Sequence, residues 1–194
     1  PLEKALNNFS KNYQQQWQTM MAAKLGIELP VDAFTEGANS LERSLFIDLE
    51  NLLMMIETDM TIFYRRLADL PDDKSYWLSH LMACFYNENE ITADYKSVLF
   101  NWLERYSQLR DNSNKHRSEI SKAMNKVNPK YVLRNYLAQQ AIDLAEKQDY
   151  TLLKQLQKVL ENPYDEQPEY DQFAEKRPDW AKNKAGCSML SCSS

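Results

Sequence analysis

The residues best suited to chemistry lie near the end of the chain, where Cys187 and Cys192 stand five positions apart in a segment rich in serine. A thiolate is the reactive form of cysteine, and an accessible thiol can exchange into a disulfide with another. The spacing leaves three alternatives open: the two thiols pair with each other, one pairs with a third cysteine, or both are incidental. A structural zinc site needs four ligands, and no further cysteine or histidine lies close in sequence, so we expect no metal site.

Histidine offers little further chemistry, because His80 and His116 are the only two in the chain. They are too few for a histidine metal centre and leave little material for a nucleophile and base pair. His80 follows Trp77 at helical spacing and is predicted to be structural, and His116 lies in a polar stretch and is predicted to be exposed. The sequence therefore predicts no catalytic residue in this chain.

Composition excludes several classes of protein. Only three glycines occur among 194 residues, so a glycine-rich phosphate loop has no material here and we expect no residue of the chain to bind a cofactor. A net charge of −5 and a pI near 5.2 argue against a nucleic-acid partner. No apolar run reaches the length of a membrane span, so we expect no membrane partner either.

The sequence pattern predicts that helices position these residues. Valine, isoleucine and threonine are too scarce for a large sheet, whereas apolar residues recur at steps of three or four. The first predicted helix, over residues 2–25, carries such a stripe and ends at Gly26. Asp59 and Thr92 are suited to cap later helices, and Asn128 and Pro129 read as the cap and first residue of another. We predict an all-α protein of about seven or eight helices. The stripe of the first helix consists of Leu2, Leu6, Phe9, Tyr13, Trp17, Met20 or Met21, and Leu25.

The chain is predicted to divide into a helical domain over residues 1–162 and an irregular segment over residues 163–194. Pro163, Pro168 and Pro178 break the helical pattern there, and six acidic residues without a base lie between positions 161 and 175. The irregular segment ends in the tail that contains both C-terminal cysteines. Cys84, on a predicted apolar stripe, is expected to serve core packing.

Charge is unevenly distributed along the chain. Residues 110–134 hold seven bases against two acids, whereas residues 28–73 hold eleven acids against three bases. The two stretches could pair within one domain, or the basic one could dock an acidic partner, although a solvated face is the commoner outcome.

Two motifs resemble the C-terminal region of the selenoprotein O family. One is Asn-Pro-Lys-Tyr-Val-Leu-Arg-Asn-Tyr-Leu-Ala-Gln at positions 128–139, and the other is Arg-Pro-Asp-Trp-Ala-Lys at positions 177–182, followed by a tail that ends in Ser-Cys-Ser-Ser. Selenocysteine-containing members carry that residue third from the end, where this chain has Cys192. Weaker similarity extends upstream over essentially the whole chain.

The resemblance implies a C-terminal portion of a protein-kinase-like fold, in a pseudokinase that transfers AMP from ATP to protein hydroxyls with Mg²⁺ or Mn²⁺. The catalytic and nucleotide-binding residues of that family lie upstream of the matched region, so the partners implied are a missing N-terminal catalytic region and the protein substrates. The start at Pro1 likewise predicts a fragment, inactive alone. Cys192, and less strongly Cys187, is implied as a redox residue, although the family's pair is of the Cys-x-x-Cys type and the spacing here is wider. A bacterial member would be cytoplasmic and a eukaryotic one mitochondrial.

Two alternatives belong to other functional classes. The chain could be a stand-alone helical module whose basic segment around Lys122 and Arg134 docks an acidic protein. It could also be a small thiol-disulfide protein acting through Cys192, although it lacks the helix N-terminus that usually activates such a thiol.

Overall fold

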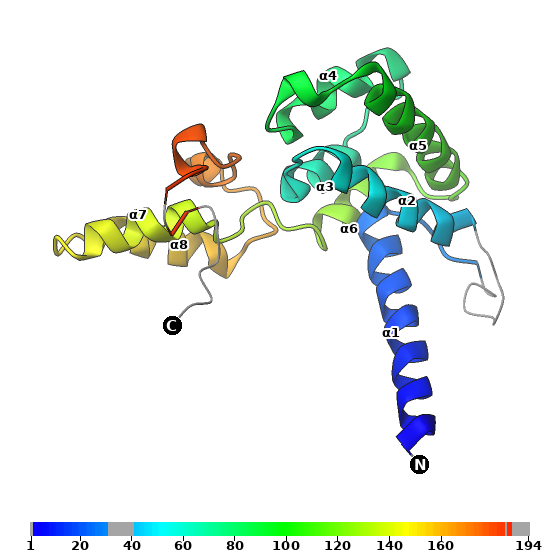
Figure 1. The fold of residues 1–194 in the computed structure, drawn as a ribbon, viewed down its shortest axis with the longest axis horizontal. Helices are drawn as coiled ribbons and strands as arrows, with labels where there is room; N and C mark the ends of the chain where they lie inside the picture. The colour runs from blue at the N-terminus through cyan, green and yellow to red at the C-terminus, as the bar shows by residue number, and fades with distance from the viewer. Residues whose placement is uncertain (1, 31–40, 185, 188–194) are drawn as a thin grey trace. The chain divides into compact units, whose positions relative to one another are not determined.

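The computed structural model describes residues 2–30, 41–184 and 186–187. These residues form α-helices joined by loops and short 3₁₀ turns, and contain no β-strand beyond a single antiparallel bridge between Thr58 and Phe85. The all-α prediction is confirmed. The chain separates into two compact units, Pro1–Val127 and Asn128–Ser194, and each is described by itself (Figure 1).

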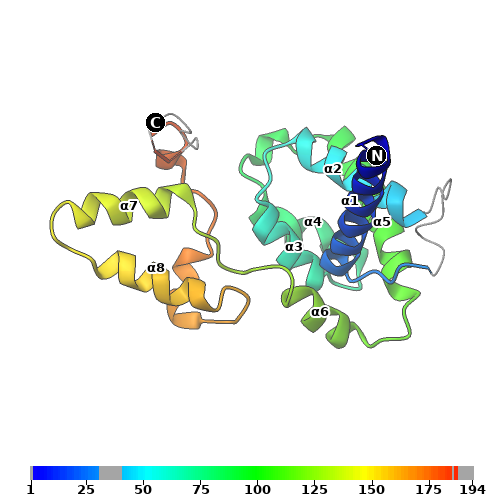
Figure 2. The same cartoon turned by 90° about the horizontal axis from the view of Figure 1, so that it is seen from below.

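The described residues of unit 1 form six α-helices, with α2 packed along α5 and α3 packed against α6 (Figure 2). At its centre the Trp102 ring stacks on Tyr106, with centroids 5.2 Å apart, and the Trp102 indole donates a hydrogen bond to the Leu45 carbonyl at 2.9 Å. Burial of these large side chains makes α5 the central element of the unit. The helices are α1 (Leu2–Leu25), α2 (Leu41–Met55), α3 (Met60–Ala68), α4 (Trp77–Leu81), α5 (Ala93–Asp111) and α6 (Arg117–Asn125).

Helix ends in unit 1 follow the predicted capping residues. The Asp59 carboxylate accepts a hydrogen bond from the Ile62 amide at 3.1 Å, and the Thr92 hydroxyl accepts one from the Tyr95 amide at 3.2 Å. Each satisfies an amide that the first turn of a helix leaves without an intrahelical partner. Both predicted caps are confirmed.

The stripe predicted along α1 does not form one buried face. Met21 and Leu25 are buried, whereas Phe9, Tyr13 and Met20 are exposed. Each step of four residues advances about 40° beyond a full turn, so a stripe built mainly from such steps winds around the helix. The helix predicted over residues 2–25 is confirmed, and the described part of its apolar stripe is buried near the C-terminal end of the helix. The side chains of Leu2 and Leu6 lie outside the described residues.

Gly26 ends α1 in the left-handed conformation, with φ of 64°. A side chain at this position would collide with Ile120 and Met124 of α6. Glycine is thus required both for the turn and for the close approach of α6.

Unit 2 is built on a hairpin of α7 (Asn135–Ala145) and α8 (Thr151–Glu161), followed by 3₁₀ turns over Pro168–Phe173 and Asp179–Ala181. Helix α7 begins at Asn135, so the prediction of a helix starting at Asn128 and Pro129 is wrong. The reason is a contact distant in sequence: the amides of Lys130 and Tyr131 both donate to the Pro163 carbonyl, at 2.8 and 3.1 Å.

The segment after α8 packs on the hairpin. Phe173, Ala181 and Cys187 are buried in one apolar cluster with residues of α7 and α8. Residues 163–187 therefore belong to the same unit as the hairpin, and the observed division falls after Val127, while the sequence suggested a boundary near residue 162.

Candidate functional site

Cys187 lies in the core of unit 2 and is 3% exposed. Its neighbours in the apolar cluster include Tyr131, Leu137 and Phe173, and its amide donates to the Lys184 carbonyl at 3.1 Å. Within the described residues its sulfur forms no disulfide. Burial limits the access of an oxidant or a second thiol to this sulfur.

The loop before Cys187 is fixed to α7 by polar and aromatic contacts. The Lys184 ammonium pairs with the Asp143 carboxylate at 3.0 Å, and the Gln139 amide donates to the same carboxylate at 2.7 Å. These two hydrogen bonds, the one from Gln139 foremost, lower the pKa of Asp143. Trp180 packs edge-on against Tyr136, with ring centroids 6.1 Å apart. The two motifs singled out in the sequence thus meet through this pair.

Cys192, the other predicted redox residue, lies outside the described residues. Cys84 is fully buried in the core of unit 1, as expected for a packing residue. The structure therefore places one of the two predicted redox cysteines and leaves their proposed chemistry a prediction.

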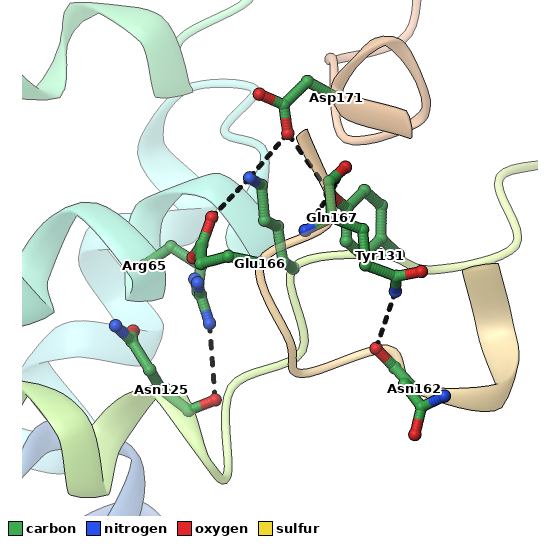
Figure 3. A network of polar contacts seen from close by, with 8 residues as sticks. Arg65, Asn125, Tyr131, Asn162, Glu166, Gln167 and Asp171 are labelled. Carbon is green, nitrogen blue, oxygen red and sulfur yellow. Dashed lines mark hydrogen bonds and ion pairs between the residues drawn. The ribbon is translucent and has the colours of Figure 1, made fainter. Parts of the chain in front are cut away.

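A polar network around Lys130 joins two segments of unit 2 (Figure 3). The Lys130 ammonium donates to the Glu166 carboxylate at 2.6 Å and to the Asp171 carboxylate at 2.7 Å. The neighbouring Tyr131 hydroxyl lies 2.9 Å from the Gln167 carbonyl and 3.2 Å from the same Asp171 oxygen. The network joins the extended residues before α7 to the acidic segment after α8.

Electrostatics within the network follow from this geometry. Partial burial alone would lower the pKa of Lys130, but the hydrogen bonds to Asp171 and Glu166 outweigh it and raise that pKa above its ordinary value. The hydrogen bond from Lys130 lowers the pKa of Asp171. Each group thus stabilises the charged form of the other, which is the behaviour of a structural ion pair.

The sequence alone did not predict that the acidic segment over residues 161–175 pairs with Lys130. Lys130 belongs to the first motif, and six acids without a base lie between positions 161 and 175, so opposite charges were available as a signal. The signal was insufficient because pairing required the chain to return from α8 to residues 130–131, which no local pattern encodes.

His80 contacts the backbone, as expected for a structural histidine, whereas His116 is exposed, as predicted. The His80 Nε2 atom lies 2.8 Å from the Arg66 carbonyl, so the proton on that nitrogen is donated to the backbone. The His116 amide donates to the Glu119 carboxylate at the start of α6, at 3.2 Å.

Basic and acidic stretches pair within unit 1. Lys115 contacts Glu28 at 2.8 Å, and Arg117 forms an ion pair with Asp72. The first pair lowers the pKa of Glu28 and raises the pKa of Lys115. Some charges of the basic stretch therefore form ion pairs with the acidic stretch of the same unit.

The described residues contain neither a metal-binding cluster nor a membrane-spanning helix. No group of three or more histidine, cysteine, aspartate and glutamate side chains in this part of the chain is arranged to hold a metal ion. None of its helices has the length and apolarity required to cross a bilayer.

Comparison with known proteins decides the family. The model of the family described as protein adenylyltransferase SelO matches residues 1–161. The chain belongs to this family. Relatives called protein nucleotidyltransferase YdiU match over its whole length, with 41% identity in Rhodopirellula baltica, 41% in Flavobacterium johnsoniae and 42% in Aromatoleum aromaticum.

The resemblance to the selenoprotein O family is thus confirmed. The matched region makes up 37%, 36% and 35% of the lengths of these three relatives, respectively. The chain therefore spans about a third of the polypeptide that its relatives contain.

Proposed function

We propose that this chain is the helical C-terminal part of an enzyme that transfers AMP from ATP to serine, threonine or tyrosine hydroxyls of proteins. The match of the SelO family model to residues 1–161 carries this proposal. The names of the whole-chain relatives, all protein nucleotidyltransferases from bacteria, support it. On the same basis we place the enzyme in the bacterial cytoplasm.

The role we assign to the chain itself is structural and regulatory. ATP and a divalent metal would bind in the part of the kinase-like protein that has no counterpart here. The scarcity of glycine supports this assignment, as does the arrangement of the described acidic side chains, which does not fit a metal ion. We therefore derive no step of the reaction through residues of this chain.

The proposal is tested by titrating the chain with ATP and Mg²⁺ in a calorimeter and by assaying the longer protein that contains it. We expect no heat of binding for the chain alone and transfer of labelled AMP to protein by the longer form. Sub-millimolar affinity of the chain for ATP would contradict the assignment of the nucleotide site. Absence of AMP transfer by the longer form would contradict the activity.

A redox role for Cys192 is the regulatory part of the proposal. Its thiolate would attack a disulfide such as oxidised glutathione and release one thiolate, and a second protein thiol would then displace the other. That second thiol is either a cysteine of the remaining polypeptide or Cys187, and pairing with Cys187 requires a rearrangement that exposes this buried side chain.

Peptide mapping of the longer protein under non-reducing conditions tests this role. After treatment with oxidised glutathione we expect a disulfide at Cys192, and a change in AMP transfer that dithiothreitol reverses. The Cys187→Ser variant identifies the partner, because it abolishes the bond only if Cys187 provides the second sulfur. A Cys192→Ser variant that still responds to oxidation like the parent protein would refute the role.

A further inference from the structure

The N-terminal half of α1 presents an apolar face that is not covered by the described residues of unit 1. Phe9 is 69% exposed and Tyr13 is 60% exposed, and their rings stack with centroids 6.4 Å apart. Met20 is 44% exposed. In Figure 1 this half of α1 extends away from the other helices of the unit.

This face differs from the one by which α1 is held. At about 100° per residue, Met20 lies within about 20° of Phe9 around the helix axis, whereas Leu25 lies about 160° away. Leu25 and its neighbours Met21 and Ala22 are buried against unit 1, where α1 contacts α2, α3 and α6. Helix α1 therefore has two apolar faces on nearly opposite sides, and the described residues of unit 1 cover only one of them.

The exposed face also lacks charge. Lys11 is the only charged residue between positions 8 and 20, and it lies about 160° around the axis from Phe9. Asn12 and Gln16 flank the aromatic pair on the uncharged side. Aromatic residues and methionine with few charges are characteristic of the core of a protein interface.

This half of the helix also lacks the means to persist alone in water. Residues 8–14 are exposed, and the stretch Asn-Phe-Ser-Lys-Asn-Tyr contains several residues with weak helix propensity. Isolated helices shorter than about 12–15 residues are marginal even in favourable sequences, and most helices in proteins depend on packing of an apolar face. Packing against a further surface would therefore stabilise residues 8–14 as helix.

We propose that the face formed by Phe9, Tyr13 and Met20, here called the outer face of α1, docks into an apolar groove of the remaining polypeptide of the longer enzyme. The inference rests on the proposed function. The remaining polypeptide is long enough to supply this groove, since about two thirds of each relative has no counterpart in this chain. The uncharged flanks predict a groove whose rim offers hydrogen-bonding groups without charge.

Amide hydrogen exchange of residues 8–17 tests the docking, measured in the longer protein and in the 194-residue chain. We expect exchange to be slower in the longer protein by about tenfold or more, which corresponds to at least about 1.4 kcal/mol of local stabilisation. Phe9→Asp should abolish the difference. Gln14→Asp is the control, because it places the same charge on an exposed position about 140° around the axis from Phe9.

Phe9→Gln provides a second variant that removes the ring without adding charge, and it should reduce the protection in the same direction. Equal exchange in the two proteins, or full protection in both Phe9 variants, overturns the proposal. Concentration-dependent dimers of the 194-residue chain that Phe9→Asp dissolves would identify a second copy as the occupant and overturn it as well. AMP transfer by the same samples is a separate readout: normal transfer without protection refutes the docking alone, and protection without transfer refutes the activity alone.

Discussion

At the scale of single residues, Lys130 determines how unit 2 closes. Its side chain is partly buried, its ammonium contacts two carboxylates of the segment that follows α8, and the adjacent Tyr131 hydroxyl lies against one of them. A lysine that loses water must regain charge-assisted hydrogen bonds, and here Glu166 and Asp171 supply them. One cation thus ties the acidic segment to the residues before α7, in addition to the 3₁₀ turn over Pro168–Phe173 and the buried Phe173 ring.

The pKa of Asp171 makes part of this stability depend on pH. Because the folded state lowers that pKa, the contribution is complete above the unfolded value near pH 4 and is lost as the pH falls through the folded value. We expect Asp171→Asn to lower the free energy of unfolding at pH 7, and the difference from the parent protein to shrink in acid. Urea unfolding at several pH values measures this. Asp165→Asn, at an exposed position of the same segment, is the control and should lower the free energy of unfolding at pH 7 less than Asp171→Asn does. A pH-independent effect of Asp171→Asn would contradict the interpretation.

At the scale of elements, Asp59 connects α3 to the loop after α4. One carboxylate oxygen caps α3 at the Ile62 amide, and the other accepts a hydrogen bond from the Tyr86 hydroxyl at 3.0 Å. The Asp59 amide donates to the Cys84 carbonyl at 2.8 Å, beside the single β-bridge of Thr58 and Phe85. Asp59 is 4% exposed, so little water is available to replace these partners.

Removing this carboxylate should destabilise unit 1 markedly. We expect Asp59→Ala to lower the free energy of unfolding by about 2–4 kcal/mol, because it removes a helix cap and leaves the Tyr86 hydroxyl without its acceptor. Tyr86→Phe should cost about 1 kcal/mol. Asp73→Ala, which removes an exposed cap bonded to the Ser75 amide, is the matched control and should cost less. Thermal or denaturant unfolding provides the comparison, and equal losses for Asp59→Ala and Asp73→Ala would show that burial does not matter here.

At the scale of the whole molecule, the features that could be predicted from the sequence are those that depend on local periodicity and capping residues. The all-α class and the caps at Asp59 and Thr92 follow from spacing and side-chain chemistry, and the structure confirms them. The start of α7 was predicted wrongly because Asn128 and Pro129 form a strong local signal. The distant Pro163 carbonyl instead binds the Lys130 and Tyr131 amides.

The same distinction applies to the candidate site. The cysteine pair could be found from residue type and spacing, whereas the burial of Cys187 depends on the return of residues 163–187 onto the α7 and α8 hairpin. The outer face of α1 could not be recognised from the sequence either. Apolar residues at steps of three and four look like one face, but each four-residue step turns the stripe by about 40° around the helix.

Gly26 fixes the direction in which α1 leaves unit 1. The residue lies about 25 Å along the helix axis from Phe9, and its backbone conformation and the contact of Ile120 and Met124 set the point from which α1 leaves the unit. At that distance, a change of about 10° in the angle of departure would carry the Phe9 ring sideways by about 4 Å, close to the thickness of an aromatic ring. The backbone conformation of Gly26 therefore determines where the Phe9 and Tyr13 rings lie, about five helical turns away.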